Sequence, residues 1–320
     1  MMKAFVSDRY GSPDVMYLED LPIPDATDER VLVRIHAISV NAHDWHMLRG
    51  KPYIARPSAG WTRPKQTVLG LDAAGVVEAV GLGVTDLAVG DEVFGSRSGA
   101  FAEYVSGKNF VRKPAGLSFA EAAAIPTAGF TALQALRDKA AVQPGDHVLV
   151  NGAGGGVGTF AVQLAKAMGA EVTATTSADN LELVHGLGAD HVIDHRSHDV
   201  AAGPARYDVI LDIGGRPSLG RLSRVLSPTG RLVIIGPGNG QWIGPIARIV
   251  GAVIRSRFSK RQLIPFLAHV DRDDLVVLRD HVEAGAIRPV IDRTFPFEQI
   301  PDAVRHVEAG KARGKVVITR

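Results

Sequence analysis

A strand, a glycine-rich loop and a helix follow one another between residues 147 and 168, and this succession constrains the fold more than any other feature of the chain. The apolar strand His147–Val150 leads into the loop Asn151–Gly158, then the helical stretch Thr159–Met168 and a second strand, Glu171–Thr176. Glycines let such a loop turn sharply, approach an anion with backbone N–H groups and pack the helix against the sheet. The helix N-terminus adds partial positive charge. The pattern predicts a βαβ unit that binds the diphosphate of a dinucleotide, through the residues Gly152, Gly154, Gly155, Gly156 and Val157.

The end of the second strand indicates which dinucleotide is bound. A site selective for NAD usually places Asp or Glu there, to bind the ribose 2′-hydroxyl. This chain has Thr176 and Ser177 instead, and the first acid is Asp179. Hydroxyl groups tolerate a 2′-phosphate that a carboxylate would repel, so we expect NADP(H), with Thr176 and Ser177 among its ligands.

The rest of the chain predicts an α/β protein with two domains. Short β-branched segments broken by Gly, Pro and Asp precede residue 119 and suggest a barrel-like β domain. After residue 146, strands alternate with helices, which predicts a doubly wound parallel sheet. We expect a discontinuous first domain (1–123 and 262–320) with a nucleotide-binding domain (124–261) inserted in it. The expected elements are strands at 31–35, 76–80, 92–94, 191–193, 207–212, 231–235, 287–290 and 315–319, and helices at 121–141, 180–187, 262–269 and 275–284.

Composition excludes several classes of protein. The 320 residues include no cysteine, so disulfides, thiolate nucleophiles, iron–sulfur clusters and cysteine-ligated zinc are excluded. A formal charge of +2 gives no case for nucleic-acid binding, and no apolar run is long enough to span a membrane. The charged start MMKAFVSDRYGSP differs from a signal peptide. We therefore expect a cytoplasmic protein.

Motifs along the whole chain resemble the zinc-independent quinone oxidoreductases of the medium-chain dehydrogenase/reductase superfamily. This resemblance implies a GroES-like catalytic β-barrel, a Rossmann domain, an active site in the cleft between them, and a homodimer. The motifs are VRIHAISVNAHDWHMLRG (33–50), VLGLDAAGVVEAVG (68–81), VGDEVFG (89–95), GAFAEYV (99–105), AAAIPTAGFTALQAL (122–136), VNGAGGGVGTFAVQLAKAMGAEV (150–172), LGADHVID (187–194) and GKVVIT (314–319).

The positions that hold catalytic zinc in related alcohol dehydrogenases differ here. By resemblance, the Cys, His and Cys ligands of those enzymes fall on Asn41, Leu71 and Thr127. Leucine cannot bind a metal, and neutral Asn and Thr are poor zinc ligands. His43 and His46 share a helical face but are more simply interpreted as one pocket and one surface histidine. We expect no catalytic metal.

Without a Lewis acid, reduction of an activated acceptor is easier than oxidation of an alcohol. A quinone or an α,β-unsaturated carbonyl accepts a hydride and delocalises the charge, so the protein needs to orient the reactants and supply a hydrogen bond or proton. The candidates are Asn41 as an amide donor, His46 as an imidazole donor, and Asp44. Simpler alternatives are that His46 only lines a pocket, that Asp44 only caps a helix, and that Trp45 only packs.

The resemblance also implies further cofactor contacts. Thr127 is expected to line the nicotinamide site, with an ordinary helix-packing threonine as the alternative. Lys315 corresponds to a lysine that lies by the cofactor in relatives, and the loop at Gly236 and Pro237 to residues near the nicotinamide ribose. His195 and Arg196 follow the LGADHVID strand on the adenosine side, where Arg196 is a candidate partner for a 2′-phosphate, although a solvated arginine is the plain alternative. The basic amphipathic segment 241–260 is expected to shape the substrate pocket or a dimer interface, with a membrane-surface role as an alternative.

Two other functions remain open at this level. One is a secondary-alcohol dehydrogenase or enoyl reductase of the same superfamily. The other is a protein that binds NADPH but serves a structural or RNA-associated role. We expect a small-molecule quinone or enone substrate, no nucleic-acid partner and no stable membrane insertion.

Overall fold

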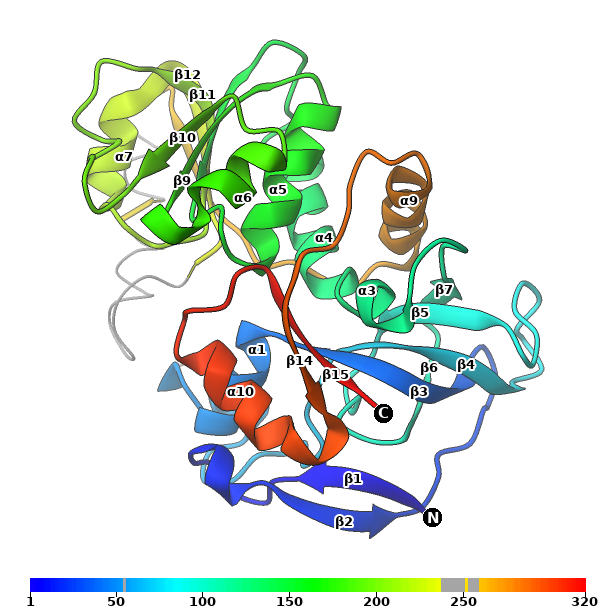
Figure 1. Cartoon of the computed structure of the whole chain (residues 1–320). Coiled ribbons are helices and arrows are strands. Elements are labelled where there is room, and N and C mark those ends of the chain that lie inside the picture. The colour runs from blue at the N-terminus through cyan, green and yellow to red at the C-terminus, as the bar shows by residue number, and fades with distance from the viewer. Residues whose placement is uncertain (54–55, 237–250, 253–258) are drawn as a thin grey trace. The chain divides into compact units, whose positions relative to one another are not determined.

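The computed structural model describes all residues except 54–55, 237–250 and 253–258 (Figure 1). It divides into two compact units. Unit 1 comprises residues 1–130, 270–285 and 289–320, and unit 2 comprises residues 131–269 and 286–288. None of the described helices is both long enough and apolar enough to cross a membrane.

Unit 2 contains a six-stranded, fully parallel sheet. The strands lie in the spatial order β10-β9-β8-β11-β12-β13. The chain begins at the central strand β8, continues to the edge strand β10, and then returns to form the other half from β11 to β13. This is the doubly wound order that places ligand-binding loops at the carboxyl ends of the strands. The strands are β8 (His147–Asn151), β9 (Glu171–Thr176), β10 (His191–Asp194), β11 (Tyr207–Asp212), β12 (Leu226–Ile234) and β13 (Gln262–Pro265).

Helices pack against this sheet through apolar side chains. In α5, residues from Gly158 to Ala165 are all buried, and α5 contacts β8 and β9 (Figure 1). A second apolar cluster, around Ile210, Leu222 and Leu232, joins β11, α7 and β12. The helical segments are α5 (Gly156–Ala167), η4 (Ala178–Asn180), α6 (Leu181–Gly186), α7 (Leu219–Val225) and a π-helical turn, η3 (Ala135–Lys139).

Unit 1 is mainly antiparallel. A seven-stranded sheet has the order β14-β15-β3-β4-β5-β7, with β6 also pairing with β3, while β1 and β2 form a separate hairpin. The C-terminal strand β15 pairs with β3, so the two ends of the chain's discontinuous unit are held in one sheet. The strands are β1 (Met2–Val6), β2 (Tyr17–Leu21), β3 (Val31–Val40), β4 (Asp72–Val80), β5 (Glu92–Ser96), β6 (Tyr104–Gly107), β7 (Phe110–Arg112), β14 (Ile291–Pro296) and β15 (Lys315–Thr319).

The core of unit 1 lies between this sheet and short helices. Val33, Ile35, Phe101, Ile300 and Val304 are buried together in one cluster. The helical segments are η1 (Pro13–Val15), α1 (Ala42–Arg49), α2 (Arg56–Ala59), α3 (Phe119–Ala123), α4 (Pro126–Gln134, which crosses into unit 2), α9 (Arg272–Glu283), η5 (Phe297–Gln299) and α10 (Ile300–Glu308).

Three predicted elements differ from the structure. The single helix expected at 121–141 is divided into α3, α4 and η3, because Pro126 lacks an N–H and begins a new helix instead of continuing one. The helix expected at 262–269 is wrong. Gln262–Pro265 is strand β13, and periodicity alone does not distinguish such a short apolar run from a helix. The strand expected at 287–290 instead begins at Ile291, where pairing with β15 starts.

Candidate active site

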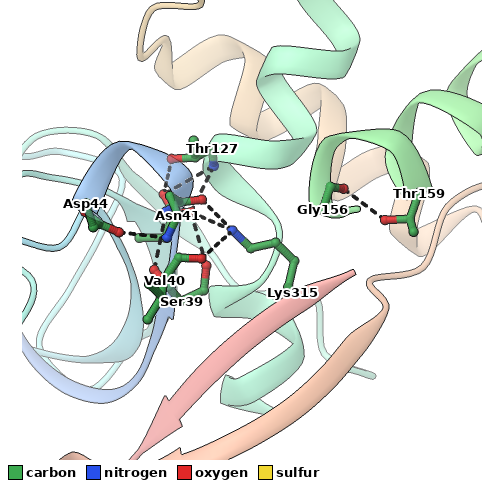
Figure 2. Close-up of polar contacts among 9 residues, drawn as sticks. Ser39, Val40, Asn41, Asp44, Thr127, Gly156, Thr159 and Lys315 are labelled. Carbon is green, nitrogen blue, oxygen red and sulfur yellow. Dashed lines mark hydrogen bonds and ion pairs between the residues drawn. The ribbon is translucent and has the colours of Figure 1, made fainter. Parts of the chain in front are cut away.

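The first turn of α1 holds Asn41 and Asp44 close together in unit 1. Asn41 is the N-cap of α1, and the Asp44 carboxylate accepts a hydrogen bond from the Asn41 backbone N–H (2.7 Å; Figure 2). This contact satisfies one of the N–H groups that a helix start leaves unpaired. The capping role considered for Asp44 is therefore observed.

Asp72, the first residue of β4, organises the cluster, and sequence analysis missed it. Its fully buried carboxylate accepts hydrogen bonds from Asn41 Nδ2 (2.9 Å), Thr127 Oγ1 (2.6 Å) and Ser39 Oγ (3.3 Å). The Thr127 backbone N–H also points at it (3.2 Å). A signal was present in the sequence, because an ionised residue in the otherwise apolar run VLGLDAAGVV needs partners if that run is a buried strand.

Lys315, at the start of β15, supplies the positive charge. Its side chain is buried, and its ammonium donates to Asn41 Oδ1 and to the Val40 carbonyl (3.4 Å) (Figure 2). It also lies 3.8 Å from the Asp72 carboxylate. Burial lowers the pKa of Lys315, and the nearby Asp72 and Asp44 carboxylates oppose that shift.

The Asn41 side-chain amide is fully engaged by this cluster. Its two N–H groups donate to Asp72 and to the Ser39 carbonyl (3.3 Å), and its oxygen accepts from Lys315. The orientation is chemically determined, since an ammonium can only donate and a carboxylate can only accept. Both N–H groups of the amide predicted as a donor are therefore already engaged within the cluster.

Asp44 is the most strongly perturbed carboxyl of the site. Burial and, to a smaller extent, the Asp72 charge raise its pKa, the Asn41 N–H and Lys315 oppose the increase, and the result is a pKa of about 7. With two buried carboxyls and one buried ammonium in the cluster, a proton on Asp44 leaves Asp72 and Lys315 as a balanced pair.

His46, two residues further along α1, has its tautomer set by the backbone. Nδ1 lies 3.1 Å from the Lys51 carbonyl, which can only accept, so Nδ1 carries the hydrogen. Burial lowers the pKa of His46 and favours the neutral ring. Nε2 of a neutral ring is an acceptor, so donation from Nε2 requires a protonated imidazole. Trp45 stacks on this ring (3.6 Å between centroids) and packs against the core.

The zinc positions of related enzymes do not fit a metal here. Asn41 Oδ1 accepts from an ammonium, the Thr127 hydroxyl donates to Asp72, and Leu71 offers no ligand. Within residues 1–53, 56–236, 251–252 and 259–320, no three His, Asp or Glu side chains are grouped so that they could hold a metal ion.

In unit 2, the glycine loop has the close contacts that its residues predict. Gly152 has φ +99°, and a Cβ there would lie 2.8 Å from the Gly214 nitrogen. A Cβ on Gly154 would lie 2.6 Å from Thr176 Oγ1, and one on Gly158 would lie 2.6 Å from the Ala153 Cα. Gly155, the N-cap of α5, faces open space. The loop therefore fits a diphosphate, which the free N–H groups of the α5 N-terminus would hold.

Polar side chains cross the carboxyl ends of the three central strands. Asn151, at the end of β8, donates to Asp212 on β11 (2.8 Å) and accepts from Thr175 Oγ1 on β9 (2.7 Å). In the first turn of α5, Thr159 Oγ1 donates to the Gly156 carbonyl (2.9 Å; Figure 2). This network fixes the strand ends beneath the loop.

The adenosine-side candidates gather at the end of β9. Ser177 Oγ accepts from Asn180 Nδ2 (3.3 Å), and the His195 ring bonds the Thr176 carbonyl through Nδ1 (2.6 Å). The Asn180 Oδ1 atom is buried with no hydrogen-bond partner among the described residues, so it can accept from a bound hydroxyl.

The predicted site residues thus form two groups. Unit 1 brings together Asn41, Asp44, Thr127 and Lys315, and His46 lies on the same helix as Asp44. Unit 2 brings together the glycine loop, with Val157 in the first turn of α5, and Thr176, Ser177 and His195; Arg196 follows His195 in the same turn.

Gly236 follows β12, and its N–H donates to the Asp212 carbonyl (3.1 Å). Pro237 and nearly all of segment 241–260 lie outside the described residues.

Comparisons with known proteins cover the whole chain. Residues 27–135 match the family described as the alcohol dehydrogenase GroES-like domain, and residues 187–318 match the family described as zinc-binding dehydrogenase. The 2-methylene-furan-3-one reductase of Solanum lycopersicum is 36% identical, over 99% of this chain and 79% of that protein.

Two further similarities agree with this one. The NADPH-dependent alkenal/one oxidoreductase of Arabidopsis thaliana is 34% identical, over 99% of this chain and 79% of that protein. The solved structure of the quinone oxidoreductase from Coxiella burnetii superposes with a TM-score of 0.86 at 31% identity, and covers 100% of this chain and 99% of that one.

Proposed function

The chain belongs to the medium-chain dehydrogenase/reductase superfamily, and we propose that it is an NADPH-dependent reductase of quinones or α,β-unsaturated carbonyls that works without a metal. The observation that carries this proposal is the buried cluster of Asn41, Asp72, Thr127 and Lys315. Two of its members, Asn41 and Thr127, stand at positions that by resemblance hold zinc in related alcohol dehydrogenases, and both are already hydrogen-bonded within the cluster, which favours acceptors that need no Lewis acid. The relatives with quinone and alkenal reductase names support the same acceptors.

We propose that unit 2 binds the adenosine and diphosphate of the cofactor. Gly152, Gly154, Gly155, Gly156 and Val157 lie at the N-terminus of α5, and Thr176, Ser177, His195 and Arg196 follow β9 and β10. When bound, NADPH supplies the hydride. Gly236, Pro237, Thr127 and Lys315 are the proposed neighbours of its nicotinamide half.

Thr127 and Asn41 have different proposed roles. The Thr127 hydroxyl donates its hydrogen to Asp72, so toward a nicotinamide it can act only as an acceptor, which suits the carboxamide N–H. Asn41, with both N–H groups engaged, holds Lys315 and Asp72 in place.

His46 and Asp44 are the proposed groups for protons. Reduction of an enone by hydride leaves an enolate that must gain a proton, and reduction of a quinone leaves a phenolate. A neutral His46 accepts a hydrogen bond at Nε2 and donates one there only after it is protonated. Asp44, with a pKa of about 7, is neutral in part of the population at neutral pH.

The test is NADPH consumption by the purified protein with a panel of simple quinones and enones. We expect oxidation of NADPH with several members of the panel. With secondary alcohols as substrates we expect no reduction of NADP+. Cofactor binding without turnover of any acceptor would refute the proposal. Thr127→Val removes only the hydroxyl contacts and should raise the KM for NADPH, while Thr62→Val changes an exposed threonine and serves as its control.

Three broader features are also proposals. We propose that unit 1 acts as the catalytic domain, near residues 1–123 and 262–320, and unit 2 as the cofactor domain, near residues 124–261. We propose a homodimer, supported by β10 and β13 as edge strands of the described sheet, where a second chain could pair. We also propose a cytoplasmic location, although some relatives carry chloroplastic or mitochondrial names. Light scattering and cell fractionation test the last two.

A further inference from the structure

A hollow of about 910 Å³ opens beside the glycine loop in unit 2. Its floor includes Asn151, Gly152 and Thr175, at the carboxyl ends of β8 and β9. Its walls come from the segment after β10, residues 195–200, and the segment after β11, residues 214–221. The cavity is therefore bounded by the carboxyl ends of β8 and β9 and by the segments that follow β10 and β11.

Each of the two walls carries an exposed arginine. The backbone N–H of Arg196 and, to a smaller extent, its charge lower the pKa of Asp194. Arg196 on one wall and Arg216 on the other are exposed, and neither forms an ion pair with a described residue. A third arginine of the hollow, Arg221, is paired with Asp199. Asp194, near Arg196 in sequence, uses its carboxylate to accept the Arg196 backbone N–H (3.0 Å) and Ser197 Oγ (3.1 Å).

The loop that carries Arg216 is fixed to the strand ends. The Arg216 carbonyl accepts from Asn151 Nδ2, and the Gly215 N–H donates to Asp212 Oδ1 (3.1 Å). Asn151 is in turn held by Thr175 (2.7 Å). The backbone at Arg216 is thus held by the network beneath the glycine loop, while its guanidinium remains available to a ligand.

We infer that Arg216, together with Arg196, binds the phosphate monoester on the adenosine ribose, which makes Arg216 a residue that determines specificity for NADPH over NADH. This inference rests on the proposed function. A guanidinium presents paired donors that match a phosphate, and two guanidinium groups in one hollow balance the charge of a dianion. The diphosphate is proposed to bind at the α5 N-terminus. The anionic group that remains for these arginines is the phosphate on the adenosine ribose.

The end of β9 agrees with this assignment. Thr176 and Ser177 stand where an acid would select an unphosphorylated ribose. Asp212, at the end of β11, is fully buried and hydrogen-bonded to Asn151. Arg216 has no place in the glycine motif, and so no sequence pattern would have identified it.

The test compares 2′,5′-ADP with 5′-AMP, two fragments that differ only in the phosphate, by titration calorimetry on the full-length protein. We expect the wild type to bind 2′,5′-ADP at least about tenfold more tightly. Arg216→Gln should lose most of that ratio and change the affinity for 5′-AMP by less than about twofold, while Arg216→Lys should restore part of it. Arg224→Gln, on an exposed arginine of α7 outside the hollow, is the matched control.

An unchanged ratio in Arg216→Gln would overturn the inference, and so would an equal loss of affinity for both fragments, because that would indicate a collapsed loop. The ratio of kcat/KM for NADPH to that for NADH should fall in parallel. If the fragment ratio depends on Arg216 but no quinone or enone is reduced, the proposed function fails and this inference stands. If quinones or enones are reduced but the fragment ratio is the same in wild type and Arg216→Gln, the proposed function stands and this inference fails.

Discussion

Replacing Asp44 by Asn should change how the stability of the protein depends on pH. Burial raises the pKa of this carboxyl from 3.8 to about 7, so between these values the folded protein holds more protons than the unfolded chain. The free energy of unfolding therefore falls as pH rises through this window, and the contribution from protonated Asp44 is fully lost above it. Asparagine does not titrate, and its side-chain oxygen can still accept from the Asn41 N–H.

The size of the effect follows from the two pKa values. Each unit of difference corresponds to about 1.4 kcal/mol, and the part that falls between pH 5 and pH 8 is about 2.5 kcal/mol. The free energy of unfolding of Asp44→Asn, measured relative to wild type, should therefore rise by about 2.5 kcal/mol between pH 5 and pH 8. Lys315 and Asp72 remain in both proteins, so the difference isolates Asp44.

Urea unfolding followed by tryptophan fluorescence suits this measurement, since Trp45 and Trp61 both lie in unit 1. Asp8→Asn makes the same chemical change on an exposed side chain and should give a difference that is flat with pH. A flat difference for Asp44→Asn as well would refute the argument that burial keeps this carboxyl protonated near neutral pH.

Two further substitutions test the two groups of site residues. Asp72→Asn leaves the Lys315 ammonium buried without its partner and should lower the free energy of unfolding, measured with urea, by about 3–5 kcal/mol. The double variant with Lys315→Met should recover part of this loss. If the losses of the two single variants simply add in the double variant, the pairing is contradicted. Gly158→Ala places a Cβ 2.6 Å from the Ala153 Cα and should lower both Tm and the affinity for 2′,5′-ADP, whereas Gly186→Ala, in α6 with open space around it, should raise stability by up to about 1 kcal/mol in thermal melts.

Sequence patterns predicted best the elements whose neighbours are near in the chain. The predicted bounds of β9, β11 and β15 agree with the structure, and the glycine loop lies between a strand and a helix as its residues indicate. In the βαβ unit, turn chemistry, helix start and strand pattern all indicate the same arrangement. Local preference and tertiary structure do not conflict there, so the local signal was sufficient.

Long-range pairing explains the errors. Gln262–Pro265 is a strand because it completes the sheet beside Arg231–Ile234, a partner that no local pattern specifies. The residue Asp72 was missed for the same reason. Its four partners come from three separate segments of the chain: Ser39 with Asn41, Thr127, and Lys315. The pairing of β3 with β4 and β15 brings the first and the last of these segments beside Asp72.

The hydrogen bonds of this cluster also explain how Asp72 and Lys315 can remain buried. A buried pair contributes little net stability compared with apolar residues of similar size, but the loss of either partner is expensive. Here each charge is also hydrogen-bonded to Asn41, so the pair fixes the amide at the start of α1, and Asp72 fixes the Thr127 hydroxyl at the start of α4. A zinc ion orients its ligands by binding them directly. In this chain an ammonium and a carboxylate orient Asn41 and Thr127 through hydrogen bonds, and protonation of Asp44 below its pKa of about 7 leaves the two charges balanced.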